Sequence, residues 1–398
     1  MNWGTSSMFG KDDRIAIVGA GMSGLVAACT LQRFGFRPLI FEKAAVLGEV
    51  GAGLTVAPNA THALQFAGLT EALARDGMAP GRGGVKHWQT GELMISLTRG
   101  PEMLEKFGAP YYHIHRADLH AALVAQVLSN DPDAIQLGCE FKGLRDAGAS
   151  VAMEFVDGTR CEAAVVIGAD GVRSAVRAAI FGPDQPRFTG YIAFRGLVPF
   201  DRLPAGIIDP PSCLSTGPDR SFARYLIRGG RVVNFVALAQ RDGWREEGWS
   251  IPATVAEVLQ EYQGWYPDVG TIIRATPHGA LFKWALCDRP TLPAWTRGRV
   301  TLMGDAAHPM LPFLGSGAAM AIEDAVVLAR AFECSQTIDV ALQRYFDARH
   351  ARTAWVAQKS REAALNYHSG RSEHYHRDRH MTAETLGIWA YNPATVSI

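Results

Sequence analysis

The sequence has no excess of charge of either sign, because Lys+Arg and Asp+Glu each number 39 among 398 residues. A balanced chain gives no reason to expect nucleic acid or an anionic membrane surface as a partner. No apolar run approaches the ~20 residues that are needed to cross a bilayer. The first residues, MNWGTSSMFGKDDR, also lack the basic and then apolar order of a signal peptide. We therefore expect a cytoplasmic protein that binds neither nucleic acid nor membrane.

Paired cysteines are missing as well, since none of the six cysteines forms a CxxC motif with another. Their spacing indicates neither a disulfide framework nor a zinc site, and it is typical of reduced thiols. The histidines near the C-terminus have no acidic partner at metal-ligand spacing, so we expect a solvated loop or helix end there and predict no metal. The cysteines are Cys29, Cys139, Cys161, Cys213, Cys287 and Cys334, and the histidines are His368, His374, His376 and His380.

What the sequence does contain, first of all, is a strand, a glycine turn, a helix and a second strand. RIAIV at 14–18 is a short β-branched run, and LVAACTLQRFG after the glycines has apolar residues at helical spacing. The second strand, PLIFEK, follows at 38–43. Such a βαβ unit has a right-handed crossover, which predicts a parallel sheet. The chain, with 48% hydrophobic residues, is also long enough for a second lobe.

The turn of this unit, GAGMSG, matches the pattern G-x-G-x-x-G. Gly19 allows the tight turn, Gly21 lets a pyrophosphate approach the backbone, and Gly24 lets helix and strand pack closely. The free amides at the helix start favour an anion, and Glu42 at the end of the second strand is placed for ribose hydroxyls. We predict dinucleotide binding by Gly19, Gly21, Ser23, Gly24 and Glu42. The alternative is a glycine turn that serves packing alone.

A second segment of similar character, GDAAHPMLPFLGSGAAMAIEDA, lies far along the chain at 304–325. A plain NAD dehydrogenase is not expected to return to a second strand that ends in Gly-Asp. Asp305 can hydrogen-bond a ribose or a polyol chain. The helix start at Gly317 and Ala318 can direct amides at a polarised carbonyl, such as that of a reduced flavin. The alternative is a Gly/Pro loop before an ordinary core helix.

Three motifs together resemble those of the FAD-dependent aromatic hydroxylases, the single-component flavoprotein monooxygenases. They are GAGMSG with Glu42, GADGVRS at 168–174, and the segment at 304–325. The resemblance runs from about Arg14 to at least Tyr345 and is greatest to the salicylate hydroxylase branch, which includes 6-hydroxynicotinate and 3-hydroxybenzoate hydroxylases. It implies tightly held FAD, NADH or NADPH as co-substrate, and O2. A flavin C4a-hydroperoxide would hydroxylate a phenolic or hydroxylated (hetero)aromatic acid, with or without decarboxylation.

Two other flavin reactions on a small aromatic compound stay open from the sequence. One is that of a dehydrogenase or reductase, which inserts no oxygen. The other is that of a halogenase, a family that carries a WxWxIP stretch. Residues 247–252 here read EGWSIP and lack the first tryptophan of that stretch.

The resemblance also assigns parts of the cofactor to particular residues. Glu42 and Lys43 would bind the adenosine ribose. Arg116 would reach the pyrophosphate or ribityl region, with a cap of its own helix as the alternative. Asp170 would lie beside flavin and pyridine nucleotide, or else cap the helix that follows it. Asp305 would bind the ribityl or pyrophosphate group. The residues that would border the isoalloxazine are Pro312, Gly315, Gly317 and Ala318, and the prolines would also form the floor of the substrate pocket.

The substrate side of the predicted site rests on five residues. Tyr225 lies where these relatives have a tyrosine that faces the ring, so it would bond a substrate hydroxyl and help to form a phenolate. A tyrosine has a reference pKa of ~10 and would need tuning or a relay to act as a base. Pyridine-hydroxylating relatives carry histidines where this chain has Thr55 and Ser221, which leaves open the general base and a hydroxynicotinate substrate. Thr55 lies in GAGLTVAPNA, which in the family lines the edge of the flavin, so it would contact the substrate and take part in catalysis, or else be a core threonine. Arg195 and Arg224 are the cations for a substrate carboxylate, or else surface arginines.

Three histidines close to these motifs are expected to be structural. His113 and His115 alternate on a probable strand, so one of the two faces inward. Either is more often packed or solvated than catalytic. His308 lies in the loop that follows Asp305, where we expect it to support the cofactor loop.

The expected fold is α/β, with a Rossmann-like FAD-binding domain, an inserted β-sheet substrate domain and a helical C-terminal segment. A monomer or homodimer is expected. The FAD-binding domain would comprise residues 1–77, 111–183 and 288–334, the substrate domain residues 78–110 and 184–287, and the C-terminal segment residues 335–398.

Overall fold

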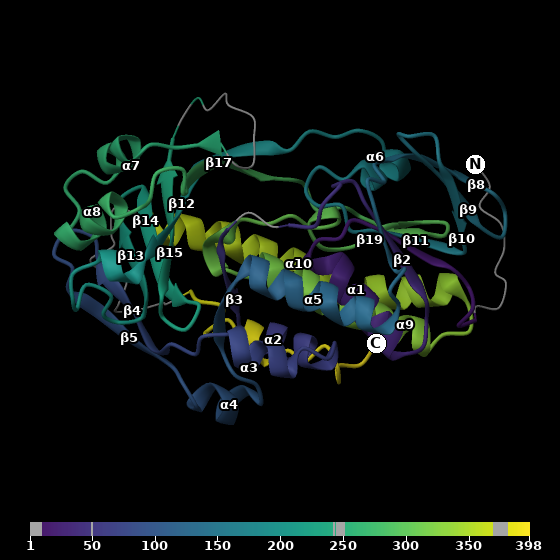
Figure 1. Ribbon diagram of the computed structural model, residues 1–398, viewed down its shortest axis with the longest axis horizontal. Helices are drawn as coiled ribbons and strands as arrows, with labels where there is room; N and C mark the ends of the chain where they lie inside the picture. Colours follow the sequence, from purple (N-terminus) through teal and green to yellow (C-terminus); the bar gives the residue numbers. More distant parts are fainter. Residues whose placement is uncertain (1–9, 49–50, 242, 244–250, 369–380) are drawn as a thin grey trace.

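The computed structural model describes residues 10–48, 51–241, 243, 251–368 and 381–398. Two large sheets lie toward opposite ends of the molecule, and long helices run along its middle (Figure 1). In the part of the chain that is described, no helix is long and apolar enough to cross a bilayer, and no group of His, Cys, Asp and Glu could hold a metal ion. Residues 247–250 of the EGWSIP stretch, and His374, His376 and His380, lie outside the described residues.

The first sheet has six strands in the order β18-β19-β11-β1-β2-β7, and all neighbours except β18 and β19 run parallel. Its strand β1 is fully buried, as expected of an apolar β-branched run in a parallel sheet. The predicted βαβ unit is confirmed by β1, helix α1 and β2. These elements are β1 Ile15–Val18, α1 Met22–Arg33, β2 Pro38–Glu42, β7 Ile135–Leu137, β11 Val165–Gly168, β18 Thr296–Arg297 and β19 Val300–Leu302.

Helix α1 is the centre of a helical layer beside this sheet. It packs on α5 and α9, and Gly24, Ala27 and Ala28 keep its surface small enough for close approach. Helix α9 is covered in turn by α2 and α10. The helices are α2 Pro58–Phe66, α3 Thr70–Asp76, α4 Glu102–Phe107, α5 Arg116–Asn130, α6 Ala175–Phe181, α9 Gly317–Glu333 and α10 Ile338–Tyr367.

The second sheet has eight strands in the order β16-β17-β12-β15-β14-β13-β4-β5, antiparallel except where β13 and β4 run parallel. Its outer face packs on α7 and α8 through a separate core that includes Phe222 and Phe235. Its inner face, with Tyr191 and Leu238, joins the core of the first sheet. The elements are β4 Gly81–His87, β5 Leu93–Arg99, β12 Arg187–Pro199, β13 Ser212–Gly217, β14 Arg220–Ile227, β15 Val232–Gln240, β16 Ile251–Pro252, α7 Val255–Glu261, α8 Pro267–Arg274 and β17 Leu281–Asp288.

Strands from two separate chain segments, 81–99 and 187–288, thus share one sheet, as expected for an inserted substrate domain, while the domain boundaries stay a prediction. In the described part of the helical C-terminal segment, α10 is the only α-helix, and residues 381–398 contain the 3-10 turn η5 (Ile388–Ala390), which packs on α2. Two small sheets complete the fold. They consist of β3 Gly53–Val56 with β6 Tyr112–His115, and of β8 Phe141–Asp146, β9 Val151–Phe155 and β10 Arg160–Ala163.

Candidate active site

The three glycines of the first turn have separate reasons to be glycine. Gly19 has φ +107°, and a Cβ there would lie 2.6 Å from the carbonyl oxygen of Ala169. A Cβ on Gly24 would lie 2.1 Å from the carbonyl oxygen of Gly19, so helix and turn could not pack. A Cβ on Gly21 would meet no atom within 4 Å. Packing therefore requires Gly19 and Gly24, whereas Gly21 leaves open space at the helix start, as close approach by a phosphate requires.

The start of α1 is suited to hold an anion in that space. Its first turn contains no acidic residue and has no side-chain cap, so the amides are left for a ligand. Ser23 is in this turn. The Glu42 carboxylate accepts hydrogen bonds from the amides of Ala20 (2.8 Å) and Ala44 (2.9 Å), which joins the glycine turn to the end of β2. Lys43 next to it is exposed.

Asp305 and Arg116 come together from opposite parts of the chain. The Asp305 side chain is exposed in the 3-10 turn η2 (Gly304–Ala306), yet burial raises its pKa, and the charges of His308 and Arg116 oppose this rise. Asp305 thus contacts solvent with Arg116 and His308 nearby. The cap of α5 is His115, whose Nδ1 accepts from the amide of Ala117 at 3.2 Å, so the alternative role of Arg116 as a cap is not observed.

A buried carboxylate supports the turn that carries Asp305. Asp324 of α9 is fully buried and accepts hydrogen bonds from the Gly304 amide (3.0 Å), from His308 Nε2 (2.5 Å) and from Arg349 Nε of α10 (2.8 Å). Burial acts to raise its pKa, but the charges of His308 and Arg349 outweigh this effect and leave the pKa lowered. His308 therefore has the structural role that its position in the loop predicted.

The start of α9 is the second uncapped helix start of the site. Gly315 adopts the left-handed conformation (φ +61°) that ends the turn η3 (Pro312–Leu314). Gly317 and Ala318 then open α9 with no acidic residue and no side-chain cap in the first turn. Both residues, like Pro312, are only partly buried. Amides that remain accessible here can stabilise negative charge on a flavin carbonyl.

Asp170 has a different environment from the other predicted cofactor residues. Its carboxylate accepts hydrogen bonds from Ser174 Oγ (2.5 Å) and from the amides of Ala175 (2.7 Å) and Val176 (3.1 Å). It therefore caps α6, which is the alternative that the sequence left open. Contact with flavin or pyridine nucleotide stays a prediction.

Tyr225 is held on the inner face of the second sheet between a histidine and a glycine. Its ring stacks on that of His113 with centroids 4.1 Å apart and planes 16° apart. A Cβ on Gly53 would lie 2.6 Å from Cε2 of Tyr225 and 2.7 Å from Cγ of Asn234, so only glycine lets β3 cross here. The amide of Gly53 donates to Asn234 Oδ1 at 2.7 Å. The ring orientation is thus fixed from both sides.

A chain of polar groups extends from Tyr225. The Thr55 hydroxyl lies 3.2 Å from His113 Nδ1, and it also interacts with the hydroxyls of Tyr225 and Tyr111. His113 Nε2 lies 3.0 Å from Ser212 Oγ. Burial and the neighbouring Tyr111 raise the pKa of Tyr225, while burial and a nearby arginine lower the pKa of His113 to about 3. Tyr225 is therefore a protonated phenol and His113 a neutral imidazole.

An apolar strip runs across the inner face beside Tyr225. Leu214, Ala223 and Val236 are cross-strand neighbours on β13, β14 and β15. All three are partly exposed, although the residues around them on this face are mostly buried. Tyr225 and Ser221 flank Ala223 two residues away on each side and therefore point to the same face.

The two predicted arginines lie on opposite faces of the sheet. Arg195 is the cross-strand partner of Val236 on the inner face, is 8% exposed, and lies over the rings of Phe282 and Trp284 at 5.7 and 5.2 Å. Arg224 faces outward and donates to the carbonyl oxygens of residues 209–210 at 3.2 and 2.8 Å. Arg195 therefore belongs to the group around the strip, and Arg224 does not.

The hydroxyls of the predicted site residues Thr55 and Ser221 each contact a histidine from another part of the chain. Thr55 contacts His113, and Ser221 Oγ lies 3.2 Å from Nε2 of His368, which ends α10. The prediction that only one of His113 and His115 faces inward is wrong, because residues two apart share a strand face and both side chains are buried. His368 lies at a helix end as expected, but it is buried and not solvated. No local pattern could indicate either contact, since the partners are 58 and 147 residues apart.

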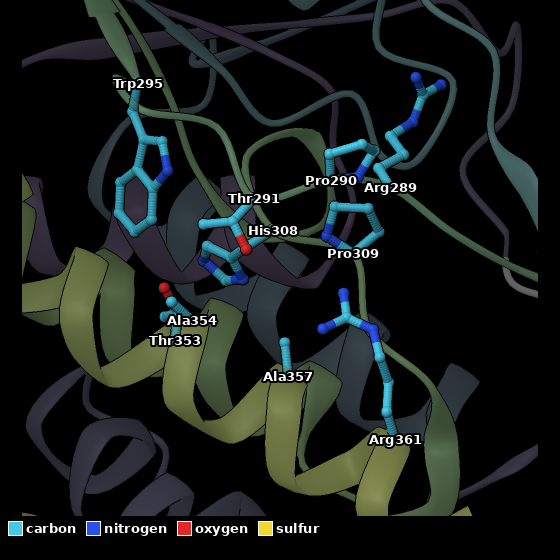
Figure 2. Close-up of a pocket in the computed structure, with 10 residues that line it drawn as sticks. All are labelled: Arg289, Pro290, Thr291, Trp295, His308, Pro309, Thr353, Ala354, Ala357 and Arg361. Atoms are coloured by element: carbon cyan, nitrogen blue, oxygen red, sulfur yellow. The ribbon is translucent and has the colours of Figure 1, made fainter.

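A small pocket lies between the loop after Asp305 and α10 (Figure 2). It is lined by His308, Pro309 and Trp295 on one side and by Ala357 and Arg361 of α10 on the other. Its volume of about 10 Å³ suits about one water molecule. A benzene ring does not fit there, so this pocket is not the substrate site.

Comparisons with known proteins agree with this arrangement. A family model described as FAD binding domain matches residues 12–360. A 3-amino-4-hydroxybenzoate 2-monooxygenase of Streptomyces platensis is 38% identical over 383 residues, which cover 95% of each chain. A 6-hydroxynicotinate 3-monooxygenase of Pseudomonas fluorescens is 36% identical over 323 residues, 80% of this chain and 82% of that one. A solved salicylate hydroxylase substrate complex has a TM-score of 0.80 at 27% identity and covers 96% of both chains.

Fold, site and relatives define an FAD-binding α/β flavoprotein. More narrowly, the chain belongs to the FAD-dependent aromatic hydroxylases, a family of monooxygenases that typically use NAD(P)H. The predicted family, fold class, enzyme class and FAD cofactor are confirmed. The open glycine turn, the exposed Asp305 near Arg116 and the two uncapped helix starts fit this cofactor. The roles of individual residues stay predictions.

Proposed function

We propose that this protein hydroxylates a phenolic aromatic acid, with NAD(P)H and O2 as co-substrates. The observation that carries the proposal is the partly exposed strip of Leu214, Ala223 and Val236, with Tyr225 at one end and Arg195 beside it. An apolar floor suits one face of a benzene ring, and the polar groups at its rim suit a hydroxyl and a carboxylate. We also infer, as predicted from the sequence, that the protein acts in the cytoplasm.

The role of Tyr225 follows from its protonated state. Because burial raises the pKa of Tyr225, its hydroxyl is a donor, and it would stabilise a substrate phenolate by a charge-assisted hydrogen bond. A phenolate oxygen raises the electron density of the ring, which the attack by an electrophilic oxygen requires. Tyr225 would therefore activate the substrate as a donor and not as a base.

Thr55 and His113 would remove the phenolic proton. The substrate hydroxyl would pass its proton to the Tyr225 oxygen as Tyr225 passes its own proton to Thr55, so Tyr225 stays protonated. From Thr55 the proton would enter His113 at Nδ1, and another would leave from Nε2 to Ser212, which is partly exposed and can release it to water. His113, whose pKa is lowered to about 3, does not keep the proton. A neutral imidazole passes a proton on by accepting it at one nitrogen and releasing it from the other.

Arg195 would bind the substrate carboxylate. It is buried on the face that carries Tyr225, and a guanidinium can pair with a carboxylate through two parallel hydrogen bonds. The rings of Phe282 and Trp284 orient its plane. Arg224, which binds two carbonyl oxygens on the outer face, would instead support the sheet.

Bound FAD would supply the chemistry that activates O2. Separate residues of the protein would hold the different parts of the cofactor. Gly21 and Ser23 would lie against the pyrophosphate, Glu42 near the ribose, and Arg116 with Asp305 near the ribityl chain. Gly317 and Ala318 would meet the isoalloxazine beside Pro312. The assay below uses NADH and NADPH in parallel.

The test is NAD(P)H oxidation by the purified yellow protein with a panel of hydroxybenzoates and hydroxynicotinates. A true substrate accelerates oxidation and yields a product that gains one oxygen atom from ¹⁸O-labelled O2. A product that also lacks the mass of CO2 would show decarboxylative hydroxylation. If no phenolic acid gains oxygen, the proposal is wrong; oxidation of a substrate without oxygen insertion would favour a dehydrogenase.

A further inference from the structure

His368 lies on the substrate side of the second sheet although it ends the last long helix of the chain. It is 5% exposed and packs against the rings of Tyr191 (centroids 5.1 Å apart) and Phe313 (5.3 Å). Tyr191 belongs to the inner face, and Phe313 belongs to η3, the turn that precedes α9. His368 therefore lies where the sheet, the η3 turn and the end of α10 meet.

The two nitrogens of His368 have different environments. Nε2 lies 3.2 Å from Ser221 Oγ. Among the residues that the structure describes, Nδ1 has no hydrogen-bond partner although it is buried. A buried polar atom without a partner destabilises the fold, so its retention needs a reason such as a ligand. Because burial and the charge of Arg220 lower the pKa of His368 to about 4, the ring is neutral and one nitrogen is an acceptor.

The position of His368 completes a triangle of polar groups around the apolar strip. Ser221, whose hydroxyl contacts His368, lies four residues before Tyr225 on the same strand face. The distance along the strand between these two residues is roughly 13 Å. That span is comparable to a benzoic acid with a hydrogen bond of about 2.8 Å at each end. Arg195 lies to the side, on the strand beyond Val236. Three polar groups around one aromatic floor suit a ring with three polar substituents.

We infer that His368 is a specificity-determining residue, whose Nδ1 accepts a hydrogen bond from an amino or second hydroxyl group on a hydroxybenzoate ring. This inference rests on the proposed function and narrows the substrate class to hydroxybenzoates with a third polar substituent. Nε2–H donates to Ser221 Oγ in this arrangement, which leaves Nδ1 as the acceptor. A neutral imidazole nitrogen can accept a hydrogen bond from an N–H or O–H group of the substrate. The substrate carboxylate would pair instead with the positively charged Arg195.

The test compares pairs of ligands that differ only in the third substituent, such as 4-hydroxybenzoate with its 3-amino and 3-hydroxy derivatives and salicylate with its 4-amino derivative. Calorimetry on the FAD-loaded protein without NAD(P)H gives each Kd. In at least one pair, we expect the wild type to bind the ligand with the third polar substituent at least tenfold more tightly than the ligand without it. In His368→Phe, which keeps a ring against Tyr191 and Phe313, this preference should vanish while the simpler ligand keeps its Kd within about threefold.

Two further variants distinguish the loss of the Nδ1 hydrogen bond from a change in packing around His368. His368→Asn places a polar atom near the position of Nδ1, and His368→Gln places one near Nε2. Asn should keep part of the preference and Gln should lose it, at equal FAD content and equal melting temperature. The inference is overturned if His368→Phe keeps the wild-type preference, or if both ligands weaken equally in every variant. If the wild type shows no preference within any pair but hydroxylates some phenolic acid, the inference is wrong and the proposed function stands. If no phenolic acid gains oxygen, the proposed function is wrong, and the inference with it.

Discussion

Asp324→Asn is the substitution that most directly separates support of the cofactor loop from substrate chemistry. Asp324 touches neither the apolar strip nor Tyr225, and its carboxylate holds Gly304, His308 and Arg349 together. Asn has nearly the same volume, so packing is preserved. The change removes one negative charge and turns one acceptor into a donor.

The expected loss of stability follows from the hydrogen bonds that the two carboxylate oxygens of Asp324 accept. Oδ2 accepts from Gly304 and His308, and Oδ1 accepts from Arg349. Whichever way the Asn amide is turned, its NH2 group meets a donor, and Arg349 loses one of its two fully buried acidic partners. Removal of one member of a buried ion pair costs about 3–5 kcal/mol. We expect a loss of that order in the free energy of unfolding.

Urea unfolding of the apoprotein, followed by circular dichroism, measures this loss, and fluorescence of released FAD measures the cofactor off-rate. The off-rate should rise because Gly304 precedes Asp305 in the same turn. Asp347→Asn is the matched control, since Asp347 is exposed on α10 and accepts only from Gln343 in the described residues. If Asp324→Asn costs less than about 1 kcal/mol, or releases FAD no faster than the control, the buried network does not support the loop.

Three further outcomes are expected. Gly53→Ala should displace the Tyr225 ring, whose Cε2 lies 2.6 Å from the added Cβ, and raise the substrate Kd about tenfold at unchanged FAD content. Tyr225→Phe should slow hydroxylation by about tenfold to hundredfold and leave FAD retention intact; equal activity would remove it from the mechanism. His113 and His368 have pKa values lowered to about 3 and about 4 by burial, so unfolded chains bind more protons. Urea midpoints should be highest above about pH 6.5 and fall toward pH 5, less steeply in His113→Asn.

The backbone framework of the predicted cofactor site could be predicted from the sequence because its signals are local. Gly19, Gly24 and Glu42 lie within one βαβ unit, and the geometry of such a unit is nearly fixed by chain direction and handedness. The same holds for Asp305 and the start of α9. Asp170 shows the limit of local reasoning, since a carboxylate before a helix predicts a cap and a ligand contact equally well, and its bonds to α6 are seen only in the structure.

The substrate half depends on contacts between distant strands and could be predicted only in part. Arg224 and Tyr225 are neighbours on a strand, so alternation alone indicates that they face opposite sides. Which of the two faces inward depends on the register of β14 with β13 and β15. The contact of Ser221 with His368 depends on where a helix of 30 residues ends relative to another domain, and no sequence period encodes this.

Helix α10 connects the two halves physically. Arg349 holds Asp324 behind the Gly304 turn, Ser360 Oγ donates to the carbonyl oxygen of Leu311 at 2.6 Å before η3, and His368 ends the helix against Ser221. From Arg349 to His368 the helix rises roughly 28 Å, at 1.5 Å per residue. One rigid element thus sets the position of the loop that is predicted to border the flavin and of one polar group beside the apolar strip. A displacement of α10 along its axis would therefore change cofactor retention and substrate preference together, whereas a change confined to Tyr225 or Thr55 would alter chemistry at the phenol alone.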